Sequence, residues 1–164
     1  MMRTTIKDVW LSDKWQRRFI DIATVVEGWS RDPSTKIGAV IVKPDTKAII
    51  ATGYNGFPRG VFNYDKRWNT RPDKYEFVVH AEVNAILNAA RMGVSVEGCI
   101  MVLSWEPTPC EGCAKAIIQS GIRMIYGPDR PFTGKGNGIH YKTEGTAETM
   151  LKEAGVTTWT MPNG

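Results

Sequence analysis

Cys110 and Cys113 are the side chains of this sequence best placed to bind a metal ion. They lie three residues apart at the expected start of a helix, so both sulfurs point to one side of it. Two thiolates at this spacing suit zinc, and the positive end of a helix favours the thiolate over the thiol. The same pair would also suit a redox centre or half of a structural zinc site, and this motif alone leaves those alternatives open.

His80 and Glu82 form a second motif, also at an expected helix start. The imidazole of His80 can bind zinc through one ring nitrogen, and at the first turn both side chains can lean over the end of the helix. With Cys110 and Cys113 this histidine makes three ligands, whereas a structural zinc site has four. Water in the fourth position would become a nucleophile. Because two thiolates cancel the charge of the ion, Glu82 would be useful as a base.

The remaining cysteine and histidine offer no evident fourth ligand. Cys99 opens an apolar run and is expected in the core, and His140 lies in a glycine-rich loop and is expected to face solvent. An odd, small number of cysteines also argues against a disulfide framework. The candidate centre is therefore expected to keep an open position.

Apolar periodicity predicts the elements that hold these motifs in place. A helix is expected over about 13–29, with Ser12 as its cap, and a turn at 43–47 joins two strands into a hairpin. The aromatic and charged segment 56–79 is expected to be a long loop. The predicted strands are 37–42, 48–54, 99–103, 123–126 and 156–161; the further helices are 81–92, 110–120 and about 147–154; a glycine-rich loop covers 128–140.

A hairpin followed by alternating helices and strands is typical of the α/β class. We expect a three-layer α/β/α sandwich with a mixed, about five-stranded sheet, and a single domain over residues 1–164. The composition, 42% apolar and 23% charged, is that of a globular chain, and the net charge of +4 suits an anionic small molecule or a weak nucleic-acid contact. The sequence shows neither a membrane span nor a signal peptide, so we expect a cytoplasmic protein.

Together the two motifs resemble the signature of the zinc-dependent cytidine and deoxycytidylate deaminases, in which a Glu that is not a ligand works beside a metal-bound water. The likeness spans about 15–127 and implies the cytidine deaminase-like fold. The segments most similar to the deoxycytidylate (dCMP) deaminase branch are 53–60, 80–86 and 113–122.

The resemblance implies hydrolysis of dCMP to dUMP and ammonia. His80, Cys110 and Cys113 would hold one Zn²⁺ per chain, because the segment 56–79 lacks the Cys and His that bind a second zinc in some relatives. Glu82 would take a proton from the metal-bound water and pass it to N3 of cytosine, while the hydroxide attacks C4. The same carboxylate would then protonate the departing amine.

Residues that contact the substrate are also implied. Asn55 matches an Asn that touches the sugar and base in related deaminases, and Arg91 matches a position tied to nucleotide binding. Trp105 is a candidate wall of the base pocket, and a role in the core is the alternative. It lies in the stretch 104–109, which differs from the compact Ser-Pro-Cys or Glu-Pro-Cys form of relatives. Arginine forks suit the phosphate. The expected substrate contacts are Asn55, Ala81, Arg31, Trp105, Arg91 and Tyr141, and further candidate cations are Lys36, Arg59 and Arg130.

The resemblance further implies regulation, because dCMP deaminases are typically homohexamers activated by dCTP and inhibited by dTTP, with Mg²⁺ bridging the triphosphate. The segment 53–60 lies near that effector site in relatives, and its glycines allow a close backbone approach to an anion. A simple turn is the alternative role of these glycines. The expected effector contacts are Lys36, Gly53, Tyr54, Gly56, Phe57, Arg59 and Gly60.

Two other functions stay open. The same zinc chemistry could act on another cytosine nucleotide or on a splayed base of tRNA. The chain has no dense basic run, however, and the segment 56–79 suits covering a small nucleotide, so neither nucleic acid nor a membrane is the expected partner. The other alternative is a non-catalytic module that binds zinc or a nucleotide, in which Glu82 has no role.

Overall fold

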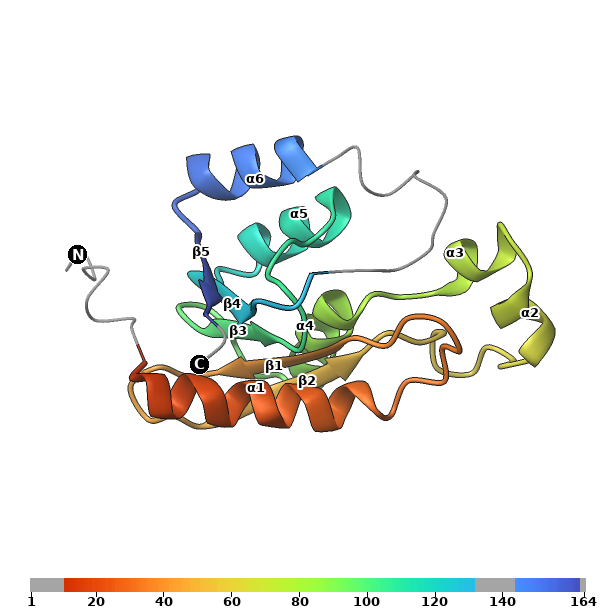
Figure 1. Ribbon diagram of the computed structural model, residues 1–164, viewed down its shortest axis with the longest axis horizontal. Helices are drawn as coiled ribbons and strands as arrows, with labels where there is room; N and C mark the ends of the chain where they lie inside the picture. Colours follow the sequence, from red (N-terminus) through yellow and green to blue (C-terminus); the bar gives the residue numbers. More distant parts are fainter. Residues whose placement is uncertain (1–10, 132–143, 163–164) are drawn as a thin grey trace.

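The computed structural model describes residues 11–131 and 144–162. Its centre is a five-stranded sheet in the order β2-β1-β3-β4-β5, with β1 antiparallel to both neighbours and β4 parallel to both of its own. The predicted mixed sheet with helices on both sides is confirmed (Figure 1). The strands are β1 (Gly38–Val42), β2 (Ile49–Tyr54), β3 (Ile100–Leu103), β4 (Met124–Pro128) and β5 (Thr157–Met161). The helices are α1 (Asp13–Glu27), α2 (Asp65–Asn69), α3 (Asp73–Phe77), α4 (Ala81–Arg91), α5 (Glu111–Gln119) and α6 (Glu144–Glu153).

Alternating strand residues supply two separate cores, one on each face of the sheet. In β1, Val40 and Val42 pack with the buried face of α1, whereas Ala39 and Ile41 join the core shared by α4, α5 and α6. Because helices cover both faces, β1 and β3 are buried at every position, and they read in the sequence as continuous apolar runs. The two cores fix the register of the strands that lead into the candidate site.

The first helix starts at Asp13, as predicted, and ends at Glu27, two residues before its predicted end. Ser12 occupies the N-cap position, but its side chain makes no capping hydrogen bond, so the predicted side-chain cap is wrong. The backbone carbonyl of Ser12 instead accepts the N–H groups of Trp15 and Gln16. Phe19, Ala23 and Val26 then form the apolar stripe that packs on the sheet.

Helix α4 packs closely against the edge strand β2. Gly53 makes this approach possible, since a Cβ there would lie 2.3 Å from the backbone nitrogen of Ala85. Two side chains of α4 also bond to the strand. Asn84 Nδ2 donates to the carbonyl of Tyr54 at 2.8 Å, and Asn88 Nδ2 donates to that of Thr52 at 2.7 Å. The strand edge and the start of α4 are thereby held together.

The segment 56–79, predicted as a loop, contains the two short helices α2 and α3, so that prediction is wrong in part. Figure 1 places both helices at one end of the molecule. Phe57 stacks on the buried ring of Trp68, with centroids 4.1 Å apart, and Phe77 packs against Phe57 at 5.8 Å. The aromatic residues that suggested a covering loop therefore form a small apolar centre of their own.

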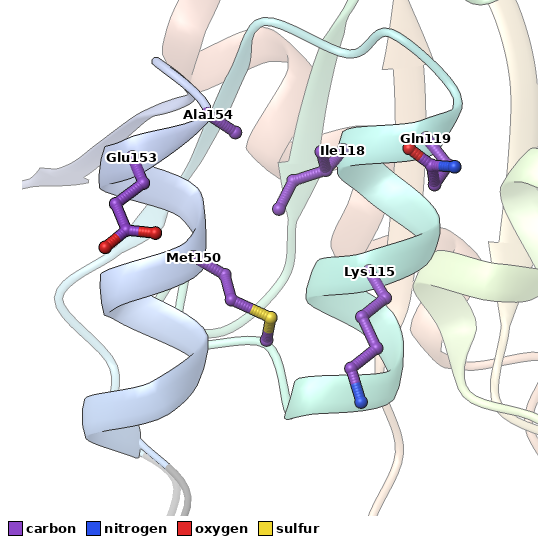
Figure 2. A pocket seen from close by; sticks show the side chains of 6 residues that line it. All are labelled: Lys115, Ile118, Gln119, Met150, Glu153 and Ala154. Atoms are coloured by element: carbon purple, nitrogen blue, oxygen red, sulfur yellow. The ribbon is translucent and has the colours of Figure 1, made fainter.

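Helices α5 and α6 flank a shallow pocket of about 350 Å³. Figure 2 shows Ile118 and Met150 pointing toward each other between the two helices, with Lys115 and Glu153 nearby. Within 11–131 and 144–162 no helix is both long and apolar enough to cross a membrane.

Candidate functional site

The candidate site lies where α4 and α5 begin. His80 is the N-cap residue of α4 and Cys110 is the N-cap residue of α5, and both have extended backbone conformations. Their carbonyls accept the first helical hydrogen bonds, from the N–H groups of Asn84 and Ala114, at 3.0 and 2.8 Å. Two residues separated by thirty positions in the sequence are therefore placed side by side by two helix starts.

His80, Cys110 and Cys113 come together as a compact donor cluster. The Nδ1 atom of His80 lies 3.5 Å from the sulfur of Cys110 and 3.4 Å from that of Cys113. All three donor atoms lie within 4.8 Å of one another. A tetrahedral zinc ion, with bonds of about 2.3 Å to sulfur and 2.0 Å to nitrogen, separates such ligands by roughly 3.5 Å. The donor types and their spacing both fit zinc, and these three are the cluster found in the described part of the chain.

The protonation of the metal-free cluster follows from its close contacts. The hydrogen bond with Cys110 raises the pKa of His80 to about 9. The hydrogen bonds from Cys113 and His80 lower the pKa of Cys110 to about 3. The bond with Cys110, together with burial, raises the pKa of the Cys113 thiol. At neutral pH the cluster therefore holds one thiolate, one thiol and an imidazolium, and a metal must displace two protons to bind all three donors.

Glu82 lies in the first turn of α4, two residues after His80, and is only 5% exposed. Burial raises the pKa of its carboxyl, and the charge of His80 opposes that effect. A carboxyl with a raised pKa beside a metal-binding cluster is suited to accept and return protons near neutral pH. The predicted base is thus buried next to the predicted ligands.

Asn55 reaches the neighbourhood of His80 through the backbone. Gly56, the next residue, exchanges two backbone hydrogen bonds with Val79, the residue before His80, at 3.1 and 2.8 Å. The side chain of Asn55 is buried and bonds to the loop that follows α1, where its oxygen accepts the N–H of Ile37 at 2.8 Å.

Trp105 lies in a polar cluster between α1 and the end of β4. Its indole Nε1 donates to a Glu27 carboxylate oxygen at 3.1 Å and to the carbonyl of Lys36 at 2.8 Å. The guanidinium of Arg130 lies over the same ring, 4.0 Å from its centroid, and pairs with Glu27 at 3.1 Å. Trp105 is therefore half-buried and hydrogen-bonded, at the start of the segment that leads to Cys110.

The other predicted cations are spread over the surface. Arg31 pairs with Asp65 of α2 at 3.4 Å, and Arg59 donates to the side-chain oxygen of Asn88 at 2.9 Å. Arg91 ends α4, nine residues beyond Glu82 and so about 14 Å away along the helix axis.

The remaining predicted substrate contacts are Ala81 and Tyr141. Ala81 is fully buried in the core behind the first turn of α4. Tyr141, like the glycine-rich loop residue His140, lies outside the described residues.

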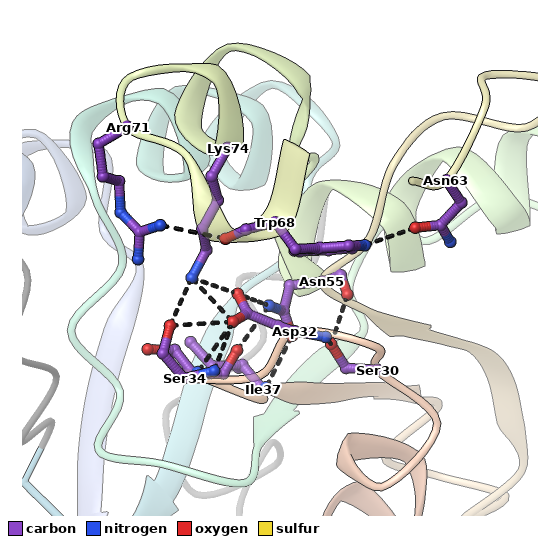
Figure 3. Close-up of polar contacts among 10 residues, drawn as sticks. Ser30, Asp32, Ser34, Ile37, Asn55, Asn63, Trp68, Arg71 and Lys74 are labelled. Atoms are coloured by element: carbon purple, nitrogen blue, oxygen red, sulfur yellow. Dashed lines mark hydrogen bonds and ion pairs between the residues drawn. The ribbon is translucent and has the colours of Figure 1, made fainter. Parts of the chain in front are cut away.

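The structure adds two residues that the sequence reading missed, Asp32 and Lys74. Their side chains form an ion pair of 2.7 Å, buried beneath the segment 56–79 (Figure 3). Asp32 lies just beyond the predicted helix 13–29, and its turn-forming neighbours Pro33 and Ser34 are the one local signal of its role. Lys74 carries no such signal.

Comparison with known proteins gives one consistent result. A sequence model described as the cytidine and deoxycytidylate deaminase zinc-binding region matches residues 13–127. A protein named as an uncharacterized deaminase in the luxG 3' region of Aliivibrio fischeri is 44% identical over 117 residues, which cover 71% of this chain and 74% of that protein. The deoxycytidylate deaminase of Mus musculus is 38% identical over 151 residues, which cover 88% of this chain and 78% of that protein.

Solved structures agree with the sequence matches. The dCMP deaminase from the cyanophage S-TIM5, crystallised in complex with dCMP and dUMP, superposes with a TM-score of 0.72 at 25% sequence identity. The alignment covers 93% of this chain and 100% of that one.

Proposed function

The chain belongs to the cytidine and deoxycytidylate deaminase family, and from that premise we propose that it catalyses the hydrolytic deamination of dCMP to dUMP with release of ammonia. The observation that carries the proposal is the buried Glu82 beside the donors His80, Cys110 and Cys113. The likeness to deoxycytidylate deaminases over most of the chain supports dCMP as the substrate.

His80, Cys110 and Cys113 would hold one zinc ion per chain, since their types and spacing fit it. Zinc bound there would lower the pKa of a water molecule and so supply a hydroxide nucleophile near neutral pH. The three donors leave one tetrahedral position for that water. Both N-cap residues belong to rigid helix starts, so the ligands need little rearrangement to meet the ion.

Glu82 would carry the protons of the reaction. Its buried carboxyl, with a raised pKa, can hold a proton at a pH where an exposed glutamate would have lost it. It would take the two protons of the attacking water in turn, deliver the first to N3 of the cytosine ring and deliver the second to the amine as ammonia departs. One side chain can serve both steps because N3 and the amine nitrogen are both bonded to C4.

Asn55, Ala81, Arg31, Trp105, Arg91 and Tyr141 remain the proposed contacts for the nucleotide. Asn55 is the best supported of these residues, because Gly56 and Val79 tie it by backbone hydrogen bonds to the residue before His80. Arg31 is exposed and pairs with a single carboxylate, which leaves its guanidinium accessible to a phosphate. Arg91 lies too far along α4 to contact a base at Glu82, so any role in this chain would be at the distal end of the ligand.

We also infer regulation by dCTP as activator and dTTP as inhibitor, with Mg²⁺ on the triphosphate, in a cytoplasmic homohexamer. The exposed side chains of Lys36, Tyr54 and Arg59 support an anion site near the segment 53–60, as does the open space at Gly60. Gly53 and Phe57 contribute differently. The backbone of α4 occupies the space beside Gly53, and Trp68 covers one face of the Phe57 ring. Both residues would therefore support the site from beneath and would not contact the effector directly.

A substrate panel tests the activity. Purified, zinc-loaded protein is incubated with dCMP, CMP, deoxycytidine, dCTP or tRNA, and ammonia and the deaminated product are measured. We expect turnover of dCMP to dUMP, increased by dCTP with Mg²⁺ and decreased by dTTP. Editing of tRNA without turnover of dCMP would contradict the proposal, and sedimentation of the same sample measures the oligomer.

A further inference from the structure

A buried ion pair joins the segment 56–79 to the loop that follows α1. Lys74 Nζ lies 2.7 Å from one carboxylate oxygen of Asp32 and 2.8 Å from the other, and the two side chains are only 5% and 2% exposed (Figure 3). Lys74 also donates to the hydroxyl of Ser34 at 2.7 Å. A well-packed apolar pair would often stabilise a fold at least as well as a buried ion pair. The ionic character of this contact therefore calls for a role other than attachment.

The carboxylate of Asp32 is the shared acceptor of a local network. It accepts the backbone N–H groups of Ser34 and Thr35 at 2.9 and 3.0 Å and the side-chain amide of Asn55 at 3.2 Å. The amide of Asn55 also donates to the carbonyl of Thr35 at 2.8 Å, and its oxygen accepts the N–H of Ile37 at 2.8 Å. These partners fix which way the amide faces and leave one acceptor site on its oxygen.

The backbone next to Asn55 connects this network to the residue before His80. Its backbone carbonyl accepts the hydroxyl of Ser30 at 2.8 Å, and the next residue pairs with Val79, directly before His80. Lys74 is thus connected to the neighbourhood of His80 through Asp32 and Asn55.

The segment 56–79 also has internal packing that does not involve Asn55. The rings of Phe57, Trp68 and Phe77 all belong to this segment, and their stacking packs the segment on itself. This packing does not include Lys74, so the link from Lys74 through Asp32 to Asn55 can be tested separately from it.

We propose that Lys74 is a positioning residue, which through the Asp32 carboxylate holds the Asn55 amide in the orientation that binds the substrate. This inference rests on the proposed function, because the ligand of Asn55 is taken to be the nucleotide. Lys74 itself touches no reacting atom, and its effect is on binding of the ground state and transition state alike.

Steady-state kinetics of Lys74→Met with dCMP give the first test. Because Asn55 would lose its fixed orientation, we expect KM to rise about tenfold while kcat stays within about twofold. Phe77→Leu is the matched control, since it loosens the aromatic packing of the same segment and leaves the Asp32 network intact. An unchanged KM in Lys74→Met, or an equal rise in Phe77→Leu, overturns the proposal.

A second readout does not depend on turnover. The side-chain amide protons of Asn55, assigned by their loss in Asn55→Asp, are followed by hydrogen exchange in ¹⁵N NMR spectra. We expect exchange about tenfold faster in Lys74→Met than in the unaltered protein, and no change in Phe77→Leu. Unaltered exchange in Lys74→Met overturns the proposal. If the protein leaves dCMP intact, the proposed function fails, and this measurement still decides whether Lys74 orients Asn55.

The double variant Asp32→Asn/Lys74→Met addresses a failure of Lys74→Met to fold. It buries no uncompensated charge, so it is expected to fold where the single variant does not. An asparagine at position 32 replaces the carboxylate that accepts from both backbone and Asn55. The same rise in KM and the same faster exchange are expected, and wild-type values in both readouts overturn the proposal.

Discussion

The donor cluster of His80, Cys110 and Cys113 and the segment 56–79 lie next to each other but are built differently. The donors lie at two helix starts, so each backbone conformation follows from the local geometry of α4 or α5, and the packing of the two helices brings the donors together. The segment packs on itself through the stack of Phe57 on Trp68, and it meets the loop after α1 through the pair of Lys74 with Asp32, 42 residues apart. The donors thus carry a local sequence signal that Lys74 and Asp32 lack.

Loss of a ligand is expected to have the largest effect and to break the cluster alone. Cys110→Ala should lose zinc and all measurable deaminase activity, because two protein donors bind the ion far more weakly than three. Metal content per chain is measured by mass spectrometry after dialysis. Cys99→Ala is the matched control, since Cys99 is a buried cysteine outside the cluster. This variant should keep one zinc ion per chain. Unchanged zinc in Cys110→Ala would contradict the ligand assignment.

Removal of the base separates metal binding from catalysis. Glu82→Gln should keep one zinc per chain and lower kcat by about 10²–10⁴-fold, the usual contribution of a general acid–base group to the rate. Glu111→Gln, at the first turn of the neighbouring helix, is the control and should retain kcat within about twofold. Full activity in Glu82→Gln would end the proposed role of this carboxylate.

Zinc affinity should depend steeply on pH. In the metal-free protein His80 is protonated below its pKa of about 9, and the raised pKa of Cys113 keeps that thiol protonated at neutral pH. Cys110, with a pKa of about 3, is already ionised. Binding then releases about two protons, so the affinity should fall roughly 100-fold for each unit of decreasing pH near neutrality. Calorimetry in buffers of different ionisation enthalpy counts the protons, and an affinity that is flat from about pH 6 to 8 would contradict this prediction.

A smaller effect tests the contact between β2 and α4. In Gly53→Ala the new methyl would lie 2.3 Å from the nitrogen of Ala85 and 2.4 Å from the oxygen of Ala81, so the helix must move. We expect a loss of about 3 kcal/mol in the free energy of unfolding, measured with denaturant. Gly145→Ala is the control, because nothing lies within 4 Å of the position that its new methyl group would take, and in helix α6 it should leave the stability unchanged or raise it. Equal stability of both variants would argue against the packing role of Gly53.

The smallest effect is expected from the second ion pair between the loop that follows α1 and the segment 56–79. Arg31 and Asp65 are 58% and 87% exposed, in contrast to the buried pair of Lys74 and Asp32. Asp65→Asn should change the free energy of unfolding by less than about 1 kcal/mol, as is usual for solvated pairs. It should also leave KM unchanged. A rise in KM as large as that of Lys74→Met would remove the distinction between the two pairs.

The sequence was informative where a function depends on neighbouring residues. Cys110 and Cys113 lie within one helical turn, so their spacing predicted that they share a site. His80 and Glu82 were joined to them by the count of possible ligands and by the resemblance to the deaminase signature. The strands were also predicted to within about two residues. In β1 and β3 the reason is burial on both faces, which leaves unbroken apolar runs.

The environment of the site was harder to predict. Asp32 and Lys74 are 42 residues apart, and each alone resembles a solvated charge. The predicted side-chain cap at Ser12 was wrong, since its hydroxyl makes no capping hydrogen bond to the first turn of α1. The helices α2 and α3 have five residues each, too short to show a helical period of apolar residues.

The side chains of Asn84 and Asn88 have a consequence for how copies of this chain can meet. β2 is an edge strand of the sheet, and an exposed edge can pair with a strand of another molecule. Here the carbonyls of Tyr54 and Thr52 already have amide donors from the helix above. Pairing of β2 with a strand of another copy is therefore disfavoured at these two carbonyls.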